Sequence, residues 1–160
     1  YTLSLHDALP IYGTQRGRLR HAIDKAGLQD WVTVTGFIPN HEVPLAMAAC
    51  RLIVMPSAYE EFGGASIEAL ATGVPVVAFA VGGLPEILGG ITPDLLIEPE
   101  NTPELIARVN AVLAGRHSQS IDPARLRAYV EKRYAPSAMG ARIVNLYRLA
   151  LINSTKPVIP

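Results

Sequence analysis

Apolar residues follow two different periods along the chain, and these periods predict helices that alternate with strands. Leu19, Ala22, Ile23 and Ala26 recur at spacings of three and four, which predicts an amphipathic helix that ends at Gly27. Short β-branched or continuously apolar runs predict strands at residues 31–35, 52–55, 74–79 and 95–97. Further helices are predicted at residues 43–50, 65–71, 103–114, 123–133 and 137–152.

The strands at 52–55 and 74–79 are apolar throughout, which is typical of a parallel sheet that helices cover on both faces. The alternating order therefore predicts an α/β fold with a doubly wound parallel sheet. Such sheets bind ligands at the carboxyl ends of their strands. We expect the functional residues in the loops that follow Thr35, Met55 and Phe79.

Composition and charge exclude several classes of protein. The 160 residues hold 14 Lys and Arg against 14 Asp and Glu, so no positive excess favours a nucleic-acid partner. The single cysteine, Cys50, excludes an internal disulfide and a multi-cysteine metal site. No apolar run approaches the roughly 18–20 residues of a membrane span, and no secretory signal opens the chain. We therefore expect a cytoplasmic domain that binds no nucleic acid.

The loop before the helix at 65–71 holds the most informative residues. Gly63 and Gly64 allow a ligand to approach the backbone closely, and the free amides at a helix start attract an anion such as phosphate. Glu60 and Glu68 flank these glycines, and a carboxylate accepts charged hydrogen bonds from hydroxyl groups, worth about 1.5–3 kcal/mol each. A nucleotide sugar carries both phosphate and hydroxyl groups. The residues alone leave a structural interpretation open, in which one acid complements the helix dipole and the other belongs to a solvated loop.

Five short motifs resemble those of family four glycosyltransferases, also called group one. They are Gly-Phe-Ile-Pro at 36–39, Met-Pro-Ser at 55–57, the Glu60 to Glu68 loop with Phe-Gly inside it, Ala-Thr-Gly-Val-Pro-Val-Val at 71–77, and Gly-Gly-Leu-Pro-Glu at 82–86. They occur in the family's order and spacing, and the resemblance extends from Gly13 to Tyr147. It implies a retaining, hexosyl-type transferase with a GT-B fold, and it implies that this chain is the Rossmann-like, C-terminal half that binds the donor.

The resemblance also implies roles for single residues. Glu60, taken as the catalytic residue, is similar to the acid that contacts hydroxyls of the transferred sugar, and Glu68 matches the acid that binds the ribose hydroxyls. Backbone amides are implied to hold the sugar and the diphosphate at Phe62, Gly63, Gly64 and Ala65. Ile38 lies where the family's backbone contacts the nucleobase, and neither a metal nor a cofactor is implied beyond the nucleotide-sugar donor. Glu61 stands where the family usually has glycine, which leaves the sugar preference open.

Two boundaries follow from the sequence. Residues 1–11 resemble the translation of a short-read sequencing adapter, so we take them as a non-native lead-in and leave them out of the fold reasoning. We expect a partial nucleotide-sugar-binding domain over 12–152 and a tail over 153–160.

The resemblance further implies that an upstream strand, an Arg/Lys pair and an acceptor domain are missing. The sheet would then be incomplete on its N-terminal side, and the isolated fragment would be unstable and inactive. In the full-length enzyme the missing domain would hold a glycan, a lipid or a small molecule as acceptor, and it leaves room for peripheral contact with a membrane.

Two other functions remain open at this point. One is a non-catalytic module that binds a nucleotide sugar without transferring it. The other is a dinucleotide oxidoreductase, which requires G-x-G-x-x-G directly after a strand. The sequence does not supply that motif, so this second alternative ranks below the first.

Overall fold

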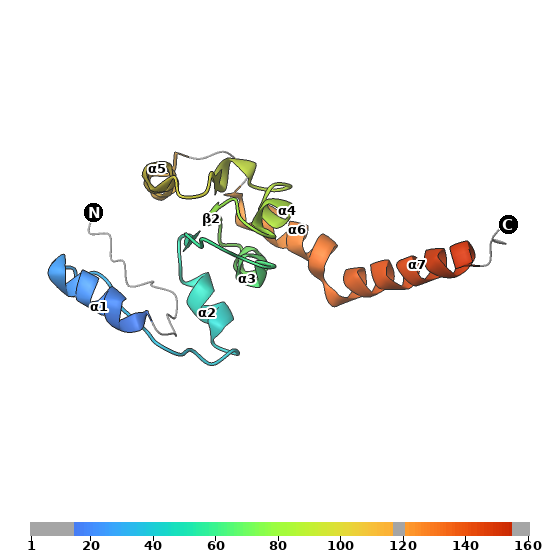
Figure 1. The fold of residues 1–160 in the computed structure, drawn as a ribbon, viewed down its shortest axis with the longest axis horizontal. Coiled ribbons are helices and arrows are strands. Elements are labelled where there is room, and N and C mark those ends of the chain that lie inside the picture. The colour runs from blue at the N-terminus through green and yellow to red at the C-terminus, as the bar shows by residue number, and fades with distance from the viewer. Residues whose placement is uncertain (1–14, 117–120, 155–160) are drawn as a thin grey trace.

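The core of the fold is a three-stranded parallel sheet in a computed structural model that describes residues 15–116 and 121–154 (Figure 1). The strands are β1 (Ile53–Met55), β2 (Val76–Phe79) and β3 (Leu96–Ile97), in the spatial order β1-β2-β3. In the parallel register Ile53 lies beside Val76, and Ala78 lies beside Leu96. All three strands therefore end at the same edge of the sheet.

A helix follows each strand, although the sequence analysis predicted none between the strands at 74–79 and 95–97. These helices are α3 (Gly64–Thr72) after β1, α4 (Leu84–Leu88) after β2 and α5 (Thr102–Leu113) after β3. Two helices precede the sheet, α1 (Arg16–Lys25) and α2 (Val43–Ala48), and two close the chain, α6 (Pro123–Tyr134) and α7 (Pro136–Ser154). A 3₁₀ turn, Pro93–Leu95, leads directly into β3.

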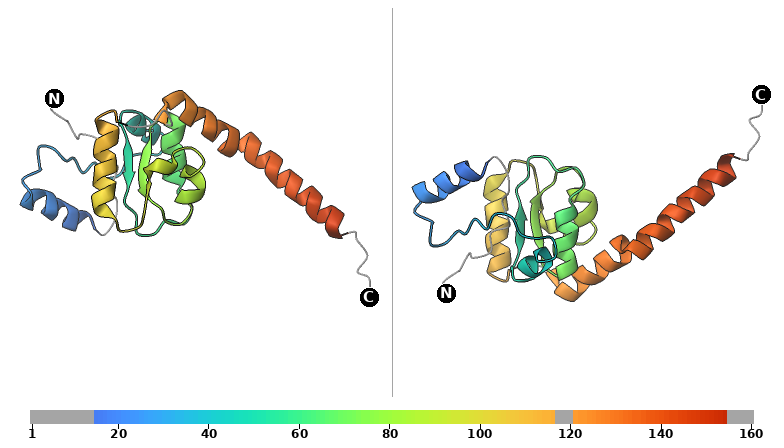
Figure 2. Two further views of the ribbon diagram at one scale, coloured as in Figure 1. Left: turned by 90° about the horizontal axis from the view of Figure 1, so that it is seen from above. Right: turned by 90° about the horizontal axis from the view of Figure 1, so that it is seen from below.

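Helices cover both faces of the sheet. Successive residues of a strand point to opposite faces, and β2 shows this clearly because all four of its residues are buried. Val76 and Ala78 pack in a cluster with residues of α2, α3, α4 and α6, whereas Val77 and Phe79 pack in a second cluster with residues of α5. Figure 2 shows α5 on one side of the sheet and α3 with α4 on the other. The doubly wound parallel sheet is confirmed.

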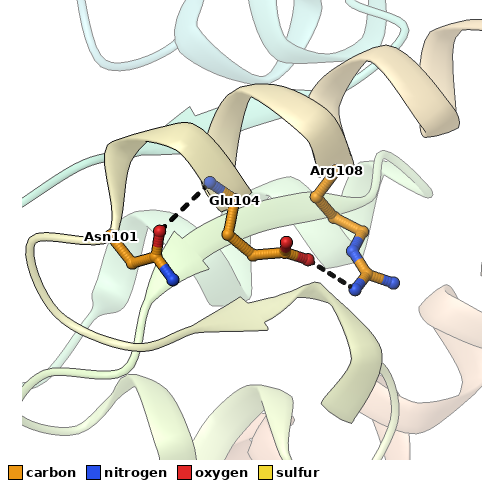
Figure 3. A network of polar contacts seen from close by, with 3 residues as sticks. All are labelled: Asn101, Glu104 and Arg108. Atoms are coloured by element: carbon orange, nitrogen blue, oxygen red, sulfur yellow. Dashed lines mark hydrogen bonds and ion pairs between the residues drawn. The ribbon is translucent and has the colours of Figure 1, made fainter.

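Side-chain caps fix the starts of α5 and α6. Asn101 Oδ1 accepts a hydrogen bond from the Glu104 N–H at 3.2 Å, and the Glu104 carboxylate accepts one from Arg108 Nη2 at 2.9 Å (Figure 3). Asp122 Oδ2 accepts a hydrogen bond from the Arg125 N–H at 3.1 Å in the same way. Such caps satisfy amides that have no partner inside the helix.

The strand predicted at residues 31–35 is absent, and that prediction is wrong. Val32 and Val34 are half-buried while Thr33 and Thr35 are exposed, so the alternation that suggested a strand is real. A strand also needs a neighbour whose backbone groups pair with its own. None of the strands in the described part of the chain pairs with this segment, and β1 has a paired neighbour only on the β2 side.

Helix α7 projects away from the sheet and exposes large apolar side chains, among them Leu146 and Tyr147 (Figures 1 and 2). It runs to Ser154, two residues into the predicted tail. The predicted lead-in over 1–11 and the rest of the tail lie outside the described residues. Within the described residues, none of the helices combines the length and the apolar character that crossing a membrane requires.

Candidate functional site

The loop over residues 56–63 leaves the carboxyl end of β1 and enters α3. Its central contact is made by Glu60, whose Oε1 accepts a hydrogen bond from the Gly63 N–H at 3.0 Å. The Glu60 side chain is half-buried, and its Oε2 has no hydrogen-bond partner in the described part of the chain. One carboxylate oxygen therefore organises the loop, and the other can accept a hydrogen bond from a ligand.

Gly63 gives the loop its shape at the helix start. Its φ of +90° lies in the left-handed region, and a Cβ built on it would meet Leu84 Cδ2 at 2.9 Å and Ile87 Cδ1 at 3.2 Å. The backbone conformation therefore favours glycine, and the two α4 side chains leave little room for a Cβ. The loop is seated on α4 at this point.

Ser66 holds the same turn from inside the helix, and the sequence analysis missed it. Its side chain is fully buried, and its Oγ donates a hydrogen bond to the Gly63 carbonyl at 2.7 Å. Serine side chains commonly bond to backbone groups three or four residues earlier in the chain. That pattern was the available signal for this residue.

The first amides of α3 are open to a ligand. The Ncap residue, Gly63, offers no side-chain cap, and the first turn of the helix contains no acidic residue. In residues 15–116 and 121–154, the N–H groups of Gly64 and Ala65 make no hydrogen bond. Unpaired amides and the positive end of the helix dipole together attract an anion.

The predicted site residues fall into three places. The turn brings together Glu60, Phe62, Gly63, Gly64 and Ala65, with the ring of Phe62 exposed at its surface. Glu68 lies one helical turn further along α3, where it is exposed and makes no hydrogen bond or ion pair with any described residue. Ile38 comes from the irregular segment before α2 and is half-buried, and within the described ranges no hydrogen bond joins it to the loop.

A cavity of about 510 Å³ lies at the opposite, amino ends of β1 and β2. Its two arginines are bound to backbone carbonyl groups at helix ends: Arg51 Nη2 donates to Leu113 O at 2.7 Å and Arg127 Nη1 donates to Thr72 O at 3.2 Å. Arg51 therefore joins the segment before β1 to the end of α5, and Arg127 joins α6 to the end of α3. Parallel sheets bind ligands at the carboxyl ends of the strands, which favours the 56–63 loop as the functional site.

The described residues contain no group of three or more His, Cys, Asp or Glu side chains arranged to hold a metal ion. Backbone amides and carboxylates are among the polar groups that the loop offers to a ligand. Such a site suits a molecule that has an anionic part and a hydroxyl-rich part.

Comparison with known proteins finds a matching family model and several relatives. The family model described as "Glycosyl transferases group 1" matches residues 8–133. A 2-deoxystreptamine glucosyltransferase from Streptomyces kanamyceticus is 45% identical over 101 residues, which cover 63% of this chain and 26% of the relative. An alpha-D-kanosaminyltransferase from the same organism is 32% identical over 139 residues, which cover 85% of this chain and 35% of the relative.

Solved structures show the same fold. A sucrose-phosphate synthase from Thermosynechococcus elongatus aligns with a TM-score of 0.74 at 30% identity, covering 88% of this chain and 35% of that protein. HepE from Anabaena, solved in complex with UDP-glucose, aligns with a TM-score of 0.72 at 27% identity, covering 85% of this chain and 38% of that protein. The chain thus spans about a quarter to two fifths of the length of these relatives.

Proposed function

The chain belongs to the group 1 glycosyltransferases, and we propose that the loop and helix start over residues 60–68, here called the donor loop, bind the nucleotide-sugar donor. The observation that carries this proposal is the uncapped start of α3, where the amides of Gly64 and Ala65 are unpaired beside the Glu60 carboxylate. The UDP-glucose bound by the structural relative HepE supports a donor of this class.

The amides and the helix dipole bind the diphosphate. A phosphate oxygen at a helix start is stabilised by N–H groups that point toward it and by the partial positive charge of the dipole. The absence of an acid from the first turn of α3 keeps this end of the helix attractive to anions. As bond cleavage begins, the same groups stabilise the charge that develops on the leaving diphosphate.

The two acids bind hydroxyl groups at either end of the donor. Glu60 keeps its hydrogen bond from the Gly63 amide, and its other oxygen accepts a hydrogen bond from a hydroxyl of the transferred hexose. Glu68, exposed one turn further along α3, accepts hydrogen bonds from the ribose hydroxyls. The backbone near Ile38 contacts the nucleobase, a role that rests on the family motif at 36–39.

The complete protein that carries this chain transfers the hexose with retention of anomeric configuration. Attack comes from the same face as the departing diphosphate, so no enzyme nucleophile is needed, and neither a metal nor a cofactor takes part. A glycan, lipid or small-molecule acceptor binds outside the donor loop. An aminocyclitol is the first acceptor to test. The names of two relatives, 45% and 49% identical to this chain over the matched residues, include 2-deoxystreptamine.

The experiment uses the complete protein with UDP-glucose and 2-deoxystreptamine, followed by ¹H NMR of the product. The α configuration of the donor is expected at the new glycosidic bond. A β-linked product would contradict retention. The alternative function, a module that binds the donor without transferring it, would show saturable UDP-glucose binding but no glycosylated product with sugar, aminocyclitol or lipid acceptors.

A further inference from the structure

The segment that follows β2 lies directly against the donor loop, backbone on backbone. A Cβ built on Gly82 would overlap the carbonyl oxygen of Glu60, and one built on Gly83 would clash with the carbonyl oxygen of Phe62. Gly82 also has a φ of +52°, which disfavours any other residue. These glycines come from a different strand–loop unit than the residues that they touch.

The contact continues into α4, which forms the floor beneath the donor loop. Leu84 and Ile87 of this helix lie under Gly63, as the close approach to its ideal Cβ shows. Helix α4 is itself held in place, because the Tyr129 hydroxyl of α6 donates a hydrogen bond to the Ile87 carbonyl at 2.8 Å. The donor loop is therefore seated on a support that α6 fixes from behind.

We propose that Gly82 and Gly83 are positioning residues for donor binding. A side chain at either position forces its own segment and the backbone of Glu60 or Phe62 apart. Because Glu60 Oε1 is bonded to the Gly63 N–H, such a shift moves the carboxylate and the amides together. The proposed sites for the hexose and for the diphosphate are thus set by two glycines of a neighbouring loop. This inference rests on the proposed donor function of the loop.

Gly83→Ala is the decisive variant. The φ of Gly83 is −77° with ψ of −11°, a conformation that alanine adopts freely, so the substitution adds only the contact with the Phe62 carbonyl. A displacement of about 1 Å in a binding constellation can cost on the order of 10²-fold in function. We expect the dissociation constant for the donor to rise at least about tenfold, and Gly82→Ala to have a larger effect because its backbone is strained as well.

Another glycine serves as a matched control. Gly27, just after α1, has a φ of +66° and open space around its ideal Cβ, and it lies outside the donor loop and the helices that support it. Alanine at this position brings backbone strain without a clash. This variant is expected to lower the melting temperature and to leave the donor dissociation constant unchanged.

Isothermal titration of the complete protein separates the outcomes. The probe is whichever of UDP-glucose, UDP-N-acetylglucosamine and GDP-mannose the wild type binds. A positioning role predicts a raised dissociation constant at unchanged stoichiometry for Gly83→Ala, whereas a purely structural role predicts lower stoichiometry at the wild-type dissociation constant and overturns the proposal.

If Gly83→Ala does not fold, Ile87→Val removes the methyl group beneath Gly63 and is expected to weaken donor binding several-fold. A wild-type dissociation constant in that variant likewise overturns the proposal. A wild-type protein that binds none of the three probes contradicts the donor function itself, which keeps the two failures distinct.

Discussion

Removing the Glu68 carboxylate tests the ribose assignment without disturbing the fold. Glu68 is exposed on α3, and none of the described residues forms a hydrogen bond or ion pair with it. Surface substitutions of this kind usually change stability by less than about 0.5 kcal/mol, and alanine favours the helix more than glutamate does. Glu68→Ala is therefore expected to fold with a free energy of unfolding close to that of the wild type.

The expected effect on donor binding follows from the lost hydrogen bonds. A hydrogen bond to a charged group contributes about 1.5–3 kcal/mol, and each 1.4 kcal/mol corresponds to roughly a tenfold change in affinity. Loss of one such bond to a ribose hydroxyl thus predicts a dissociation constant about 10- to 150-fold higher. Glu68→Gln, which keeps an acceptor oxygen but loses the charge, is expected to fall between alanine and the wild type.

Isothermal titration of the complete protein with its nucleotide-sugar donor provides the measurement. Glu131→Ala is the matched control, since Glu131 is also an exposed acid on a helix, α6, outside the donor loop. This control is expected to bind the donor as the wild type does. An unchanged dissociation constant in Glu68→Ala would refute the assignment of Glu68 to the ribose.

Three further predictions test the binding chemistry and the fold. Because amides rather than a metal hold the diphosphate in this proposal, EDTA is expected to leave turnover unchanged, and a loss that Mg²⁺ or Mn²⁺ restores would contradict it. Tyr129→Phe removes the hydrogen bond to Ile87 and is expected to cost about 1 kcal/mol at neutral pH in denaturant unfolding. Burial raises the pKa of Tyr129 above its ordinary value of 10.0, so the wild type loses stability as the pH rises through the raised value. The difference in free energy of unfolding between the wild type and Tyr129→Phe is therefore expected to narrow above pH 10. A difference that stays constant would argue against this titration. Asn101→Ala removes the cap on the Glu104 amide and is expected to cost about 1 kcal/mol, with Asn101→Asp near the wild type in thermal unfolding; equal melting temperatures would exclude a stabilising cap.

The fold was predictable wherever local pattern and tertiary packing agree. The run at 74–79 is apolar throughout, and β2 within it is buried on both faces, as a central parallel strand should be. Gly73 was predicted to end the helix before this strand, and it is the Ccap of α3, with a φ of +84°. Here each residue's own preference matches its place in the structure.

The segment at 31–35 shows where such prediction stops. Alternation at Val32 and Val34 reports that one side of the segment is shielded, and the structure agrees. Pairing depends on a neighbouring strand, which is a property of the whole sheet and not of these five residues. The same limit applies to helix boundaries: the observed ends differ from the predicted ends by a few residues.

The site was predictable in part. The loop between β1 and α3 was expected from its glycines and acids, and the structure gathers the predicted residues of that loop in one turn. The bond from Ser66 to Gly63 and the contact of Gly82 with Glu60 were not predicted. The second of these joins loops about twenty residues apart, and it exists only because β1 and β2 are neighbours in the sheet.

A crystal structure of the complete protein with its bound nucleotide-sugar donor tests the central claim most directly. The account predicts diphosphate oxygens about 2.7–3.2 Å from the backbone nitrogens of Gly64 and Ala65, with the Glu68 carboxylate on the ribose and Glu60 on the hexose. A donor bound elsewhere, for example in the cavity beside Arg51 and Arg127 at the amino ends of the strands, would contradict it.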